Sequence, residues 1–136
     1  MRTAVAGAAL AAVLAACGNA QANVEQAFRG YHTALLDRDF RTACSYNTPE
    51  ATDRLISSLR TQGIDAGSCE DAFAAIYAEA GGSATADGVG NSVQIEGITV
   101  DGDNATVNWT AELDGEQRPA QSTMRRDDGR WQFVAD

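Results

Sequence analysis

The chain has 136 residues and a net charge of −9 at pH 7, because 19 acidic residues outnumber 10 arginines and there is no lysine. Such an acidic protein is repelled by nucleic-acid phosphates and by anionic lipid head groups, which argues against nucleic-acid binding and peripheral binding to phospholipids. Abundant alanine together with the lack of lysine is typical of GC-rich coding, as in actinobacteria.

The first 16 residues have the pattern of a secretory leader. Arg2 gives a single positive charge, and the apolar run from Ala4 to Ala16 is shorter than the roughly 20 residues that a spanning helix needs. A short apolar core followed by small residues is typical of a signal peptide. The segment Leu14-Ala15-Ala16-Cys17 resembles the lipobox of bacterial lipoproteins, in which the cysteine thiol receives a diacylglycerol.

This resemblance implies three segments. Residues 1–16 would be the signal peptide, residues 17–23 a short tether lipidated at Cys17, and residues 24–136 the folded domain. The expected location is the outer, non-cytoplasmic face of the cell membrane, with the lipid as the membrane contact. An ordinary signal peptide that ends near a cysteine, or a buried N-terminal helix, is the alternative.

The other two cysteines, Cys44 and Cys69, form an even pair in an oxidising compartment, which favours a disulfide over two free thiols. They cannot complete a zinc site, because His32 is the only histidine and zinc prefers four ligands. Asp101 and Asp103 match the first two ligand positions of a calcium-binding loop, but Thr106 occupies the position where that loop requires glycine. A hairpin turn explains these residues better. We therefore expect no metal or other cofactor.

Apolar residues at steps of three and four predict helices in the first part of the domain. Residues 24–37 form the first helix, with Asn23 as its cap, and a short helix follows the cap Asp39. A third helix begins at Thr48 and Pro49 and runs to about Arg60. A fourth begins at Ser68 and ends at the Gly81-Gly82 pair, after which residues 83–91 are predicted to be a mobile loop.

From residue 92 the pattern changes to strands. Residues 93–100 form a strand with an irregularity at Gly97, and residues 105–113 alternate between apolar and polar side chains. Residues 118–126 form a third strand, with Pro119 at an edge or bulge, and residues 130–134 a fourth. Tight turns separate these strands, and helices followed by an antiparallel meander indicate the α+β class.

The domain resembles the NTF2-like superfamily, also called SnoaL-like or cystatin-like. Three stretches carry the resemblance: residues 31–40, the meander of residues 93–134, and its closing hairpin, residues 124–134. The resemblance implies N-terminal helices packed on a curved antiparallel sheet, a cone that leaves a pocket. Members include enzymes, binding modules and dimerisation domains, so the fold alone does not give the function.

Several side chains are candidates for a site. Tyr31 resembles the pocket tyrosine of some enzymes of this superfamily, with Asp53 as the candidate carboxylate, but it also suits a core. His32 follows Tyr31 on the helix, so it is expected to be exposed if Tyr31 is buried, and it is not expected to be catalytic. Trp109 and Trp131 either fill the core or line an apolar pocket together with Tyr31.

The leading hypothesis is a surface-tethered lipoprotein whose NTF2-like module is not an enzyme and binds a small apolar ligand or an exported partner protein. One alternative is a SnoaL-like isomerase, dehydratase or hydrolase that uses Tyr31 and a carboxylate. Another is a domain that forms a homodimer through its sheet face.

Overall fold

The computed structural model describes residues 8–135, with side chains from residue 18 onward. Within these residues the helices come first and the strands follow, as the sequence predicts. The helices are α1 (Ala8–Leu36), α2 (Phe40–Ser45), α3 (Pro49–Thr61), α4 (Cys69–Ala78) and α5 (Gly82–Ser92). The strands are β1 (Gln94–Asp101), β2 (Asn104–Leu113), β3 (Glu116–Asp127) and β4 (Arg130–Phe133).

The four strands form one antiparallel sheet in the order β1-β2-β3-β4. The predicted irregularity is present, because the register between β1 and β2 shifts between Ile95 and Gly97. Asp101 pairs with Asn104 across the predicted hairpin turn. Pro119 pairs with Thr110 of β2, and β4 pairs only with Met124–Asp127, so the proline lies where the other edge of β3 has no partner strand.

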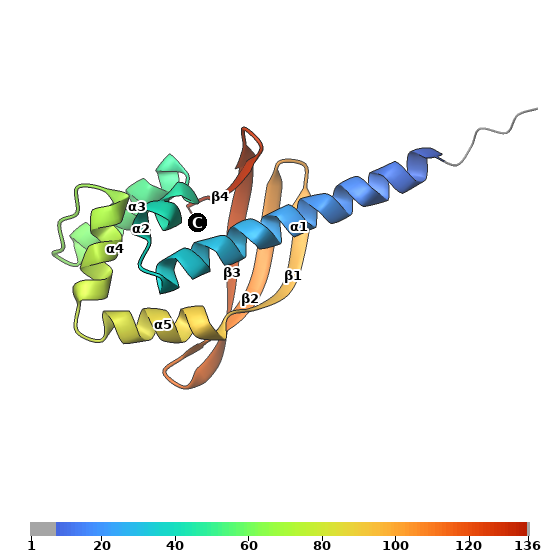
Figure 1. The fold of residues 1–136 in the computed structure, drawn as a ribbon. Coiled ribbons are helices and arrows are strands. Elements are labelled where there is room, and N and C mark those ends of the chain that lie inside the picture. Colours follow the sequence, from blue (N-terminus) through green and yellow to red (C-terminus); the bar gives the residue numbers. More distant parts are fainter. Residues whose placement is uncertain (1–7, 136) are drawn as a thin grey trace, which may run out of the picture.

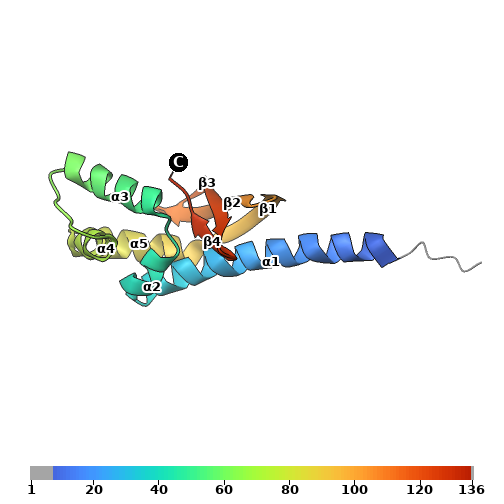
Figure 2. The same cartoon turned by 90° about the horizontal axis from the view of Figure 1, so that it is seen from above.

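The long helix α1 crosses the sheet, and the other helices gather around its C-terminal half (Figure 1). The view from above shows α4 and α5 between α1 and α3 (Figure 2). One face of the sheet packs against α1, and Val24 and Phe28 of the helix meet Val107 and Met124 of the sheet in a fully buried core. The opposite face carries Thr, Asn and Gln side chains, which gives β2 the alternation that the sequence predicts.

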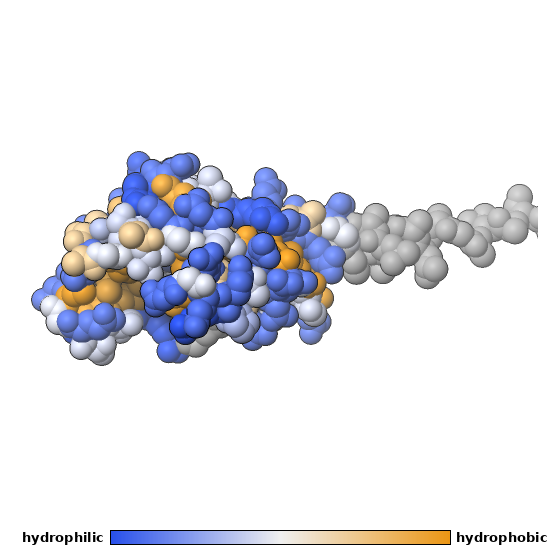
Figure 3. Space-filling model, turned by 90° about the horizontal axis from the view of Figure 1, so that it is seen from below, coloured by the Kyte–Doolittle hydropathy of each residue, from blue (hydrophilic) through white to orange (hydrophobic). Residues whose placement is uncertain are grey.

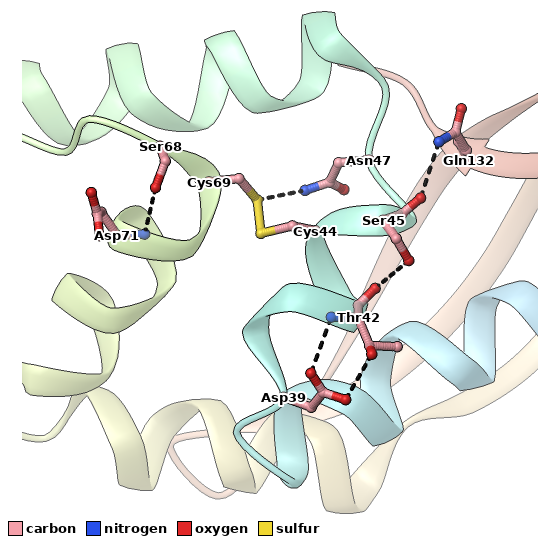
Figure 4. Close-up of a disulfide and its surroundings, with 9 residues drawn as sticks. All are labelled: Asp39, Thr42, Cys44, Ser45, Asn47, Ser68, Cys69, Asp71 and Gln132. Carbon is pink, nitrogen blue, oxygen red and sulfur yellow. Dashed lines mark hydrogen bonds between the residues drawn. A yellow bond between two sulfur atoms is a disulfide. The ribbon is translucent and has the colours of Figure 1, made fainter.

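Three helices begin at the predicted cap residues. Asp39, Thr48 and Ser68 each accept a hydrogen bond from the backbone N–H three residues later. Figure 4 shows the Asp39 and Ser68 caps. Thr48 is fully buried, and its backbone N–H also donates to the carbonyl of Phe133 at 2.9 Å, which fixes the start of α3 to the last strand.

The predicted disulfide joins Cys44 of α2 to Cys69 of α4, with the two Cα atoms 5.9 Å apart (Figure 4). The amide Nδ2 of Asn47 lies 3.8 Å from the Cys69 sulfur and donates to it. The bridge closes a loop of 25 residues that contains all of α3. It therefore holds together two helices that approach α1 from different parts of the chain.

The first helix is longer than predicted. The sequence suggested a start at Val24 with Asn23 as the cap, but α1 is continuous from Ala8, so residues 17–23 are helical and Asn23 lies inside a helix. Residues 8–23 are rich in alanine and contain no proline, which makes them strong helix formers. Within the described part of the chain, no helix has both the length and the hydropathy that crossing a membrane requires.

The predicted mobile loop at residues 83–91 is also wrong, because these residues form α5. Glycine and alanine made the segment look unstructured, but tertiary contacts stabilise the helix. Arg38 holds Asp87 with two hydrogen bonds of 2.7 and 2.9 Å and donates a third, of 2.6 Å, to Ser83. A Cβ atom at Gly90 would lie only 2.8 Å from a methyl carbon of Leu36, so the missing side chain lets α5 approach α1 closely.

A candidate ligand cavity

A cavity of about 680 Å³ lies between the inner face of the sheet, the C-terminal half of α1, and helices α4 and α5. Small-molecule sites commonly have volumes of about 300–1,000 Å³. The cavity is lined by Tyr31, His32, Leu35, Leu36, Asn47, Phe73, Ile76, Tyr77, Glu79, Ala80, Gly81, Gly82, Thr85, Ala86, Val89, Gly90, Trp109, Ser122 and Phe133.

The exposed lining residues show where the cavity opens. Glu79, Ala80, Gly81 and Thr85 are exposed, and all four lie at the connection from α4 to α5 or in the first turn of α5. Figure 3 shows hydrophobic residues gathered at the end of the molecule where α4 and α5 meet, next to the polar tip of the β2–β3 hairpin. The mouth of the cavity therefore lies beside α5, near the C-terminal end of α1.

Aromatic rings form the inner wall. The ring centroids of Tyr31 and Phe133 are 4.6 Å apart, and those of His32 and Trp109 are 5.5 Å apart. Phe73 adds a third side, with its centroid 6.3 Å from that of Tyr31. Because these rings come from α1, α4, β2 and β4, the wall depends on the complete fold and not on one motif.

The polar groups of the wall are few and neutral. The indole N–H of Trp109 donates to the Ser122 hydroxyl at 3.0 Å. Tyr31 and His32 make no side-chain hydrogen bond to another described residue. Among the described residues, every fully buried side-chain nitrogen or oxygen atom has a hydrogen-bond partner. Both residues line the cavity and their side-chain polar atoms are not sealed from its surface, so the Tyr31 hydroxyl and the His32 ring nitrogens can hydrogen-bond to a guest.

Burial keeps both groups uncharged. It lowers the pKa of His32 to about 4, because the surrounding rings replace the water that would solvate the imidazolium ion. It also raises the pKa of Tyr31 well above the ordinary value for a phenol, and the nearby Tyr77 hydroxyl adds to this effect. At neutral pH the inner end of the cavity thus holds a neutral imidazole and a neutral phenol.

Formal charge near the cavity is sparse. Of the lining residues, Glu79 is the one carboxylate, it lies at the exposed mouth, and none is an arginine. Arg38 lies close by, with its guanidinium 4.3 Å from the Tyr77 ring centre, but it is paired with Asp87. The described residues contain no cluster of three metal-ligating side chains.

The structure brings together some of the predicted site residues. Tyr31 and Trp109 line the cavity, whereas Trp131 is buried in the core against Val24 and Phe28. Asp53 lies on exposed α3 in a separate groove, so the structure does not place it with Tyr31. Cys17 falls within α1, but its side chain lies outside the described residues.

The expectation that Tyr31 and His32 differ, with His32 exposed if Tyr31 is buried, does not hold. Tyr31 and His32 are both half-buried, because the cavity wraps around the helix and receives both neighbours. Sequence reasoning also missed Tyr77, Val89 and Gly90 as lining residues. The apolar spacing of Phe73, Ile76 and Tyr77 is consistent with Tyr77 facing inward from α4, whereas Val89 and Gly90 carry no such signal because their segment is rich in glycine and alanine.

Comparison with known proteins identifies no family profile that matches the chain and no curated protein that matches its sequence. Solved structures do match. A SEC-C motif containing protein from Rhodopseudomonas palustris has a TM-score of 0.53 at 21% identity, with 85% of this chain and 77% of that chain covered.

Two further structures are NTF2-like. A putative NTF2-like transpeptidase from Campylobacter jejuni matches with a TM-score of 0.52 at 15% identity, covering 84% of this chain and 99% of that chain. An NTF2-like protein with a cystatin-like fold from Novosphingobium aromaticivorans matches with a TM-score of 0.53 at 16% identity, covering 92% of this chain and 83% of that chain. At these identities the likeness concerns the fold alone. The chain therefore has the NTF2-like, cystatin-like α+β fold that its sequence predicts.

Proposed function

We propose that this protein is an exported lipoprotein, anchored through Cys17, whose NTF2-like domain binds a small apolar ligand without transforming it. The observation that carries the binding role is the cavity of about 680 Å³, with its aromatic wall and its few neutral polar groups. Binding sites for small molecules have this composition, in which apolar lining supplies affinity and a few polar atoms fix the orientation.

The arrangement of carboxylates supports binding over catalysis. General acid–base chemistry needs a proton donor and acceptor within reach of the same reacting atom. Tyr31 lines the cavity, whereas its candidate partner Asp53 lies in the groove beside α3. Glu79 is the one carboxylate of the lining, and it stands at the exposed mouth, away from the aromatic inner wall.

The outer face of the sheet supports a monomeric binding module over a homodimerisation domain. Its central cross-strand pairs are polar: the amide of Gln121 donates to Asn108 at 2.9 Å, and Thr106 is opposite Thr123. The central part of a stable protein interface is apolar, with few charged groups. Over the described strands, this face lacks the apolar surface that a second copy or an exported protein would cover.

Blocking the cavity tests the binding role. The neutral apolar dye Nile red would be titrated into exported protein carrying Cys17→Ser, which prevents lipidation, with and without Ala86→Trp. Ala86 lines the cavity, whereas Ala84 is exposed on the same helix and lies outside the lining, so Ala84→Trp is the matched control. We expect Ala86→Trp to weaken dye binding at least tenfold and Ala84→Trp to leave it unchanged; equal binding by both variants would refute the proposal.

The anchor is tested separately. We expect wild-type protein to fractionate with membranes and to carry the added mass of a diacylglycerol on Cys17, because two buried acyl chains hold a protein firmly. Cys17→Ser should move it to the soluble fraction, whereas the neighbouring Gly18→Ser should not. A Cys17→Ser protein that stays with the membrane would exclude the lipid as the anchor.

A further inference from the structure

We propose that the ligand of this cavity is electrically neutral, with an apolar body and an uncharged hydrogen-bonding group at its inner end. This inference rests on the proposed binding function and adds the chemical class of the ligand. An apolar acid, such as a fatty acid in its ionised form, is thereby excluded as the physiological guest.

The inner wall offers no charge for a guest to pair with. Tyr31, His32 and Ser122 supply two hydroxyl groups and a neutral imidazole, and these can donate to or accept from a hydroxyl or carbonyl group. A carboxylate moved into such a site without a cationic partner loses its hydration and is strongly disfavoured. A neutral alcohol or ketone loses much less, because each of its polar atoms can find one of these groups.

Arg38, the arginine that contacts a lining residue at Tyr77, is already paired. The Arg38 guanidinium lies over Tyr77, but it donates to both carboxylate oxygens of Asp87, to Ser83, and to the carbonyl of Leu35. Capturing an anionic guest would require Arg38 to leave Asp87 and release α5. The carboxylate of Glu79 at the mouth, together with the net charge of −9, further repels an anion before it enters.

Two probes that differ only in their head group test the inference. Decanol and decanoate would displace Nile red from the Cys17→Ser protein at pH 8, below the concentration at which decanoate forms micelles. At this pH decanoate is ionised and His32 is neutral. We expect decanol to compete at a concentration at least tenfold lower than decanoate. Decanoate that competes as well as decanol would overturn the inference and leave the proposed binding function intact.

A charge introduced into the cavity gives a second test. Ala86→Lys places an ammonium group in the lining, and Ala84→Lys adds the same charge on the exposed side of α5. We expect Ala86→Lys to shift the preference toward decanoate about tenfold and Ala84→Lys to leave it unchanged. An equal shift in both variants would show that net charge sets the selectivity and would overturn the inference. Nile red binding that is insensitive to Ala86→Trp would instead refute the binding function itself.

Discussion

The imidazole of His32 lies among aromatic rings, with its ring centroid 4.6 Å from that of Phe28, 5.1 Å from that of Tyr31 and 5.5 Å from that of Trp109. These neighbours exclude water without offering a counter-charge, and for this reason the pKa of His32 falls to about 4. The residue therefore serves the cavity as a neutral hydrogen-bonding group at ordinary pH.

This depressed pKa predicts a dependence of stability on pH. The pKa of His32 is near 6.5 in the unfolded chain and about 4 in the folded chain. Between these pH values the unfolded state therefore binds more protons than the folded state. The free energy of unfolding should then fall by about 1–2 kcal/mol between pH 7.5 and pH 5. Urea denaturation of the wild type and of His32→Phe at both pH values measures this difference.

His32 is the only histidine, so no other imidazole contributes to that interval. The variant should lose most of the decrease, because phenylalanine keeps an aromatic ring in the same place but does not titrate. Equal decreases in the two proteins would mean that the imidazole is as well solvated in the folded state as in the unfolded chain.

Single residues also show where sequence reasoning reaches its limit. The caps Asp39, Thr48 and Ser68 could be predicted because capping depends on neighbours three positions away. The position of His32 could not, because helical periodicity tells which side of α1 a residue faces but not how far a cavity extends around the helix. The separation of Tyr31 from Asp53 likewise depends on how α3 packs.

Among the elements, α5 depends most on tertiary contacts. Its own sequence is poor in helix formers, because Gly82, Gly88 and Gly90 lie within eleven residues. Arg38, which follows α1, stabilises this helix through hydrogen bonds to Asp87 and Ser83. Strand positions were easier to predict, because the alternation in β2 and the Asp-Gly turns are local signals.

Removing the Arg38 contact should therefore loosen α5. We expect Arg38→Gln to speed amide hydrogen exchange in residues 82–92, while the rest of the domain exchanges as before. Arg29→Gln is the matched control, because it removes an arginine that lies within α1 and pairs with Glu25 instead of with a residue of α5. The same exchange pattern in both variants would show that helix packing alone holds α5.

The disulfide acts between α2 and α4. In the chain-entropy model, a bridge that closes 25 residues stabilises a protein by about 3–4 kcal/mol. We expect the double variant Cys44→Ala with Cys69→Ala to lose about this much in urea denaturation under oxidising conditions. Adding a reductant to the wild type should reproduce the loss, and a wild type unaffected by full reduction would contradict this assignment.

At the scale of the whole molecule, helix α1 connects the proposed anchor to the cavity. At about 1.5 Å per residue, the 15 residues from Cys17 to His32 span about 22 Å. Gln21, near the middle of α1, donates to the carbonyl of Ile98 at 3.3 Å, so the helix is held against the sheet four residues after Cys17. The proposed anchor at Cys17 and the mouth of the cavity therefore lie toward opposite ends of the domain.

Mass spectrometry of the exported Cys17→Ser protein shows whether the cavity holds a small neutral ligand. Spectra under native and denaturing conditions would be compared for this protein, for Ala86→Trp and for Ala84→Trp. We predict an added mass of a few hundred daltons at most, within the cavity volume of about 680 Å³, that is seen only under native conditions and disappears only in Ala86→Trp. An added mass that persists in Ala86→Trp would place the guest outside the cavity and contradict the proposed binding role.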